Sequence, residues 1–144
     1  MPTAQSILER KGGEVQTIPA TATVLEAAHL MNERRIGALV VVEDERAVGI
    51  FTERDILNRV VAAERSPAET RVKEVMTSPM ACCRRDTKLA DCRAVMTQKR
   101  IRHLPVVEDG ELFGMISSGD ILALESDDRQ AAIEYLHEYL YRHR

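Results

Sequence analysis

One feature constrains this sequence more than any other: its two halves repeat each other at a spacing of 65 residues. Residues 36–57 align with residues 101–122 without a gap, and 10 of the 22 aligned pairs are identical. In the first copy, the identical positions are Ile36, Leu39, Val41, Val42, Glu43, Asp44, Gly49, Asp55, Ile56 and Leu57. Two copies are too few for a solenoid. We therefore expect the copies to pack against each other about a pseudo-twofold axis.

The hydrophobic runs predict two consecutive strands in each copy. Valine-rich stretches bounded by acidic residues are typical of buried strands. Short acidic turns follow them, and the second turn contains the Asp-Gly pair that favours a two-residue hairpin. The expected strands cover residues 38–42 and 47–51 in the first copy, and 104–107 and 112–116 in the second.

Threonine and serine residues mark the expected helix starts. Thr23 stands three residues before Glu26, which is the capping-box spacing, and Thr87 is expected to begin the matching helix of the second copy. Thr52 and Ser117 follow the second strand of each pair and are good N-cap residues. With a further strand ahead of the first helix, each copy is predicted to have the order β-α-β-β-α.

The fold class is therefore predicted as α+β, with two repeats and a helix at each end. A short helix over 4–11 should end at Gly12, and a C-terminal helix is expected after residue 126. The expected units are residues 4–63 for the first repeat with the N-terminal helix, 72–125 for the second repeat, and 127–144 for the C-terminal helix.

Composition and charge exclude several classes of protein. The net charge is −3 and 30% of the residues are charged, which gives no reason to expect nucleic-acid binding. The longest purely apolar stretch, residues 38–42, is too short to cross a membrane, and no signal peptide is apparent. The three cysteines suggest neither a disulfide framework nor a zinc site. We expect a cytoplasmic protein with no membrane and no nucleic-acid partner.

A duplicated motif, Gly-x-x-Thr/Ser-x-x-Asp, leaves the last strand of each copy. Thr52 and Asp55, like Ser117 and Asp120, are three residues apart at a helix start, so their side chains face the same way. Free N–H groups at a helix start favour a phosphate, and a carboxylate one turn later can accept hydrogen bonds from ribose hydroxyls. Plain helix capping with a solvated aspartate is the alternative.

The doubled β-α-β-β-α unit with this motif resembles the CBS domain pair, also called a Bateman module. The segments "Val-Met-Thr-Ser-Pro" at 75–79 and "Arg-His-Leu-Pro-Val-Val" at 102–107 are similar to family sequences. The chain is most similar to short stand-alone bacterial members. The resemblance implies a regulatory module that binds an adenosine ligand such as AMP, ATP or NAD(H) and acts through a partner protein.

The resemblance also implies which residues form the sites, because ligands of this family lie in two clefts between the repeats. The Asp of one repeat then faces a base pocket supplied by the other. The first site is expected to contain Thr52, Asp55, Met80, Ala81, Cys82, Arg102, His103, Leu104 and Pro105. The second site is expected to contain Ser117, Asp120, Thr17, Ile18, Pro19, Ala38, Leu39 and Val40.

The two sites should differ in charge. Arg102 and His103 align with Gly37 and Ala38, so the first site gains two groups for phosphate and should prefer more highly phosphorylated ligands. The alternative is that Arg102 belongs to a solvated basic face.

Two further expectations concern assembly and activity. A homodimer is implied by the resemblance, through helix faces around Leu30, Met31, Val95 and Met96. No nucleophile elbow, P-loop or metal motif is present, so an enzyme is not expected. A structural scaffold with unoccupied clefts remains as the alternative function.

Overall fold

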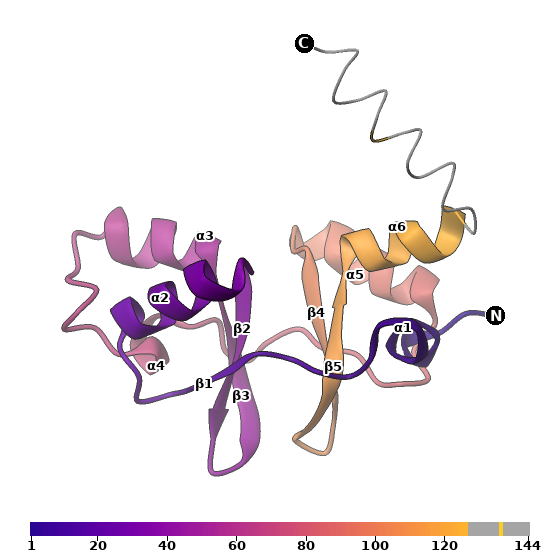
Figure 1. Ribbon diagram of the computed structural model, residues 1–144, viewed down its shortest axis with the longest axis horizontal. Helices are drawn as coiled ribbons and strands as arrows, with labels where there is room; N and C mark the ends of the chain where they lie inside the picture. Colours follow the sequence, from indigo (N-terminus) through magenta and orange to yellow (C-terminus); the bar gives the residue numbers. More distant parts are fainter. Residues whose placement is uncertain (127–135, 137–144) are drawn as a thin grey trace.

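The computed structural model describes residues 1–126 and residue 136; apart from residue 136, the C-terminal helix predicted over 127–144 lies outside the described residues. The elements, in chain order, are α1 Ala4–Lys11, β1 Thr17–Pro19, α2 Val24–Arg34, β2 Ala38–Glu43, β3 Arg46–Thr52, α3 Glu53–Asp55, the π-helix η1 Ile56–Val61, α4 Val72–Val75, α5 Leu89–Lys99, β4 His103–Glu108, β5 Glu111–Ser117 and α6 Ser118–Ser126. Figure 1 shows the two repeats side by side, with their strands at the centre and their helices outside. The predicted α+β class and the paired repeats are confirmed.

The two hairpins match the sequence prediction closely. Both join their strands by two residues, because Glu43 pairs with Arg46 and Glu108 with Glu111. The turn residues have positive φ: 51° and 64° in the first turn, and 54° and 81° in the second. These values define type I′ turns, whose twist suits antiparallel strands. The Asp-Gly pair of the second turn is thus placed where its conformational freedom is needed.

The first strand of the second repeat is reduced to a single bridge. In the first repeat, β1 runs parallel to β2, and the Val40 N–H donates to the Gln16 carbonyl at 3.2 Å. The position that corresponds to Val40 is Pro105, which has no N–H to donate. The second repeat therefore keeps only an isolated parallel bridge between Cys83 and Val106. Its sheet has two strands, where the first repeat has three.

Three of the four predicted helix starts are correct. The hydroxyl of Thr23 accepts from the Glu26 N–H at 3.1 Å, and Thr52 and Ser117 cap their helices in the same way. Thr87 does not begin α5, because its hydroxyl accepts from the Arg84 N–H at 2.9 Å in the preceding turn. The residue before α5 is Lys88, whose side chain makes no capping bond.

Each repeat completes its core with a helix from the segment that precedes the other repeat. α4, which leads into the second repeat, buries Val72 and Val75 in the first core. α1, which leads into the first repeat, buries Ala4, Ile7 and Leu8 in the second core. Grouping the N-terminal helix with the first repeat was therefore wrong, because its apolar face is covered by α6 and β5 of the second.

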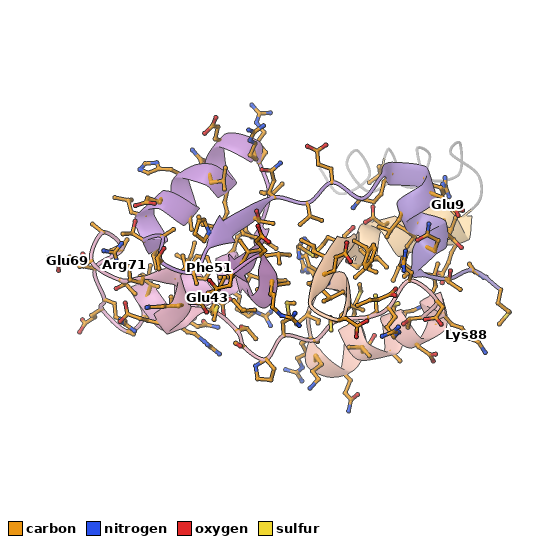
Figure 2. The ribbon with its side chains drawn as sticks, turned by 90° about the horizontal axis from the view of Figure 1, so that it is seen from below. Glu9, Glu43, Phe51, Glu69, Arg71 and Lys88 are labelled. Atoms are coloured by element: carbon orange, nitrogen blue, oxygen red, sulfur yellow. The ribbon has the colours of Figure 1, made fainter. Side chains whose placement is uncertain are left out.

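The figures show the same exchange of leading helices. In Figure 1, α1 (indigo) lies beside β5 and α6 (orange), and the chain then crosses to the first repeat. In Figure 2, seen from below, Glu9 of α1 lies beside the second repeat while Phe51 lies within the first.

The two sheets face each other between the cores. Along β2, Leu39 and Val41 belong to the first core, while Val40 between them is equally buried but lies on the opposite face. Side chains alternate across a strand, so the face of Val40 is turned toward the other repeat. The Ala47 N–H donates to the Gly110 carbonyl at 3.2 Å, which joins the hairpins directly.

The exposed apolar residues differ from the expected ones. Met31 and Met96 are each 5% exposed and belong to the two cores, so they cannot form an open helix face. Leu57, Val61 and Leu122 are instead about 60% exposed. Leu57 and Leu122 are matching positions of the repeat. No helix within the described residues is long and apolar enough to cross a membrane.

Gly49 allows the segment after α4 to lie directly on β3. A β-carbon at this position would lie 2.8 Å from the Met76 sulfur and 2.9 Å from the Thr77 carbonyl oxygen. At Gly119, the nearest atom to an added β-carbon is 3.7 Å away. The two glycines therefore offer a matched test of how tightly the segment is packed.

We predict that Gly49→Ala lowers the free energy of unfolding by about 1–3 kcal/mol, as overpacking does elsewhere. Gly119→Ala should be neutral or stabilise by up to about 1 kcal/mol, because it replaces a helical glycine. Urea denaturation of both variants checks this. Equal stability of Gly49→Ala and the wild type would contradict the close packing.

Candidate functional site

The chain passes from the first repeat to the second through the predicted first site. Thr77 pairs with Ile50 of β3, with N–H to carbonyl distances of 2.9 and 3.1 Å. Six residues later, the Cys83 N–H donates to the Pro105 carbonyl of β4 at 2.9 Å. Residues 80–82 therefore lie between the start of α3 and the start of β4. The crossing segment thus connects the surroundings of Asp55, which bonds to Thr77, to Pro105 of β4.

A similar crossing connects the two groups of residues predicted for the second site. The Lys11 ammonium, at the end of α1, lies 2.8 Å from Oδ2 of Asp120. Five residues later, Gln16 accepts from the Val40 N–H, and Thr17 then pairs with Val40. The chain therefore runs within a few residues from its contact with the start of α6 in the second repeat to its pairing with β2 in the first.

Not every predicted residue presents its side chain at a site. Ile18 and Leu39 are buried in the first core, and Leu104 is buried in the second. Only the backbone of these three residues is available for a ligand. Ala81 is partly buried and packs against the second core. The other predicted contact residues lie outside the two core clusters: Thr17, Pro19, Ala38, Val40, Met80, Cys82, His103 and Pro105.

Asp55 is enclosed by protein groups. Its side chain is 7% exposed. Oδ2 accepts from the Thr52 N–H at 3.0 Å and lies 3.3 Å from the Thr52 hydroxyl, and Oδ1 accepts from the Thr77 hydroxyl at 3.0 Å. The Arg59 guanidinium lies 3.7 Å from Oδ1. The carboxylate thus ties the start of α3 to the crossing segment that carries Thr77.

Asp120 is more open than Asp55. Its side chain is 24% exposed, and Oδ2 accepts from both the Ser117 N–H and the Lys11 ammonium at 2.8 Å. Within residues 1–126, no hydrogen bond to Oδ1 is found. Burial disfavours the charged form of Asp120, but the hydrogen bonds from Lys11 and Ser117 and the charge of Lys11 outweigh it, so the pKa lies below its usual value.

Sequence reasoning missed Lys11, Arg59 and Thr77. Thr77 lies inside the segment 75–79 that carried the resemblance, so its position was marked but its role was not. Lys11 is 109 residues from Asp120, and no local pattern could pair them. The expected difference in charge was wrong in one respect, because the second site has a cation that the repeat alignment does not reveal.

Arg102 and His103 differ in their surroundings. Arg102 is exposed, whereas His103 is half-buried at the start of β4. Burial lowers the pKa of His103, and the charges of Lys11 and Arg102 lower it further, while Glu53 and Asp120 act in the opposite direction. Since Glu53 adjoins Thr52 of the first site and Asp120 belongs to the second, His103 is within electrostatic range of groups at both sites.

An open pocket lies next to the first site. Its lining residues are Ala28, Met31, Asn32, Arg35, Ile36, Gly37, Glu53 and Ile56. It is formed mainly by α2 and the loop that follows. None of its lining residues was predicted for either site, although Gly37 adjoins Ala38 and Glu53 adjoins Thr52. It is therefore a neighbour of the site between the repeats.

Comparison with known families identifies the repeat unit. The model described as "CBS domain" matches residues 9–62 and again residues 72–127. The chain belongs to the CBS-domain family. The two matched segments are the two repeats, so the chain is a CBS-domain pair, which is a regulatory module.

Similar proteins and structures extend over most of the chain. It is 32% identical over 126 residues to CBS domain-containing protein YhcV of Bacillus subtilis, covering 88% of this chain and 89% of YhcV. It is 34% identical over 123 residues to the mitochondrial CBS domain-containing protein CBSX3 of Arabidopsis thaliana, covering 82% of this chain but 60% of CBSX3. A protein with CBS domains from Burkholderia ambifaria has a similar structure, with a TM-score of 0.83, 39% identity and coverage of 89% and 96%.

We predict that the lowered pKa of His103 makes the CBS pair sensitive to acid. The unfolded chain binds a proton near pH 6.5 and the folded chain only at lower pH, so the free energy of unfolding is fully retained above 6.5 and falls as pH drops below it. His103→Asn should reduce this fall. Urea denaturation at pH 7.5 and 5.5 measures it.

The matched control is His29→Asn, which replaces an exposed histidine on α2 and should keep the wild-type pH dependence. If His103→Asn and the wild type lose the same stability between the two pH values, His103 does not carry the effect.

Proposed function

We propose that this CBS pair binds an adenosine-containing ligand, such as AMP, ATP or NAD(H), between its repeats and thereby regulates a partner protein. The observation that carries the proposal is the position of Ser117 and Asp120. They stand at the start of α6, and the chain that leads into the first repeat passes beside them.

The groups at the second site suit a ribose and a phosphate. Oδ1 of Asp120 can accept a hydroxyl, because a carboxylate has room for about four hydrogen bonds. The Ser117 hydroxyl accepts from the Asp120 N–H at 3.1 Å, and it also interacts with the Asp120 carboxylate, whose pKa it helps to lower. In a complex, the hydroxyl can turn its proton to a ligand oxygen.

The first site would bind its ligand differently. Its carboxylate is almost fully enclosed, so a ribose at Asp55 would have to replace the Thr77 hydroxyl. We therefore propose that the second site binds first and that occupation of the first requires the crossing segment at Thr77 to shift.

The proposed role needs no catalysis. We propose a cytoplasmic regulatory protein and not an enzyme, with its output passed to a partner. The chain spans 60% and 58% of the length of two curated relatives that it matches. The regulated partner protein is therefore a part of this proposal. The alternative is a scaffold whose sites stay empty, and ligand binding distinguishes the two.

We predict that Asp120→Ala weakens AMP binding at the second site by about 10- to 100-fold, because it removes charged hydrogen bonds of about 1.5–3 kcal/mol. Isothermal titration calorimetry measures the affinity. Asp91→Ala, which removes an exposed aspartate on α5, is the control and should bind as the wild type does. If the wild type binds none of AMP, ATP and NAD(H), the scaffold is favoured.

We also propose that two CBS pairs associate through the exposed leucines at matching positions of the repeat. Leu57 is 60% exposed and Leu122 is 61% exposed, so each repeat leaves an apolar side chain open to solvent at the same position of its pattern. A hexameric CBS-CP12 protein of bloom-forming cyanobacteria has a similar structure, with a TM-score of 0.74, 32% identity and coverage of 96% and 83%. Its assembly supports self-association here without fixing the number of subunits.

We predict a mass of about 32 kDa in light scattering at micromolar concentration, twice the 16.2 kDa of the chain. Changing both leucines, Leu57→Glu with Leu122→Glu, should return the mass to that of one chain, because a dimer would bury unpaired carboxylates. Leu25→Glu changes an exposed leucine on α2 and should leave the mass unchanged. A wild-type mass of one chain would contradict the dimer.

A further inference from the structure

The N-terminal helix delivers a cation to the second site. α1 is held on the second repeat by Ala4, Ile7 and Leu8, which are all buried. Lys11 is the last residue of the helix, and its ammonium lies 2.8 Å from Oδ2 of Asp120 and 3.1 Å from the Met115 carbonyl oxygen. The position of this charge is therefore fixed by a helix docked in a core and by two oxygen atoms.

The ammonium of Lys11 still has a hydrogen bond to give. It carries three N–H groups, and within the described residues two oxygens accept from them. The Lys11 side chain is 38% exposed and that of Asp120 is 24% exposed. The third N–H can reach a ligand while the lysine keeps its contact with Asp120.

The same lysine resolves a conflict of charges. A carboxylate that binds ribose hydroxyls stands close to the phosphate of the same nucleotide and repels it, since like charges this close disfavour each other. Lys11 neutralises Asp120 at a distance of 2.8 Å. The site can then accept an anionic ligand close to the start of α6.

We infer that Lys11 is a specificity-determining residue of the second site. Its ammonium donates to the phosphate of a nucleotide whose ribose is bound by Asp120, and it gives phosphorylated adenosine compounds their advantage over adenosine. The inference rests on the proposed function and adds that Lys11 discriminates between phosphorylated and unphosphorylated ligands. A bound phosphate would also strengthen the docking of α1, because the ligand and the helix share this lysine.

The test compares AMP with adenosine by isothermal titration calorimetry. Every variant carries Asp55→Asn, so that the first site lacks its carboxylate. Lys11→Met should weaken AMP binding by about tenfold or more, as the loss of a charged hydrogen bond does, and should change adenosine binding by less than about threefold. Lys11→Arg should restore most of the preference for AMP.

Arg10→Met is the matched control, because it removes the same charge from the neighbouring, exposed position of α1. It should keep the preference of the parent protein for AMP. Thermal unfolding without ligand identifies any variant whose α1 no longer docks.

The outcomes separate the inference from the proposed function. Loss of AMP affinity with adenosine affinity retained supports the role of Lys11. Equal losses for both ligands, no loss, or the same loss in Arg10→Met would overturn it while leaving adenosine binding in place. If neither the wild type nor the Asp55→Asn parent protein binds AMP or adenosine, the proposed function fails and the inference fails with it.

Discussion

The structure depends on one exchange: each repeat takes the helix that completes its core from the segment leading into the other repeat. Val72 and Val75 fill the first core, and Ala4, Ile7 and Leu8 fill the second. Burial of these side chains, at roughly 25 cal/mol per Å² of apolar surface, fixes where both leading segments must run. The segments then pass between the repeats, beside the two helix starts that carry the Thr/Ser and Asp residues. Packing of the cores therefore places the candidate sites.

The two sites share a backbone plan but differ in how their carboxylates are satisfied. Asp55 is closed by Thr52 and Thr77, with Arg59 nearby. Asp120 meets only Ser117 and Lys11 and keeps one oxygen open within the described part of the chain. The Asp55 carboxylate mainly holds the start of α3 to the segment that carries Thr77. The Asp120 carboxylate has an oxygen that can accept a hydrogen bond from a ligand. Both repeats carry the motif, but different neighbouring side chains give Asp55 and Asp120 different surroundings.

The sequence predicted what depends on local pattern. The offset of 65 residues located both hairpins, and the positions of Thr52 and Ser117 gave the starts of two helices, because turns and caps are decided by a few neighbouring residues. Prediction failed where one residue changed a pattern or where distant residues meet. Pro105 removed the N–H that a third strand needs, and Thr87 bonded to its own turn. Lys11 meets Asp120 only because α1 packs on the far repeat, which no periodicity encodes.

The exchange of leading helices also sets the order in which the chain can become compact. All residues of the first core lie between Ile18 and Met76 in the sequence, so this half can close as soon as that stretch has left the ribosome. The second core joins residues 4–8 to residues 83–121. Its first helix is made before these partners and stays without them until residues 83–121 follow, which raises the entropy cost of closing the second half. We therefore expect a nascent chain to pass through a stage with its first half closed and α1 not yet buried.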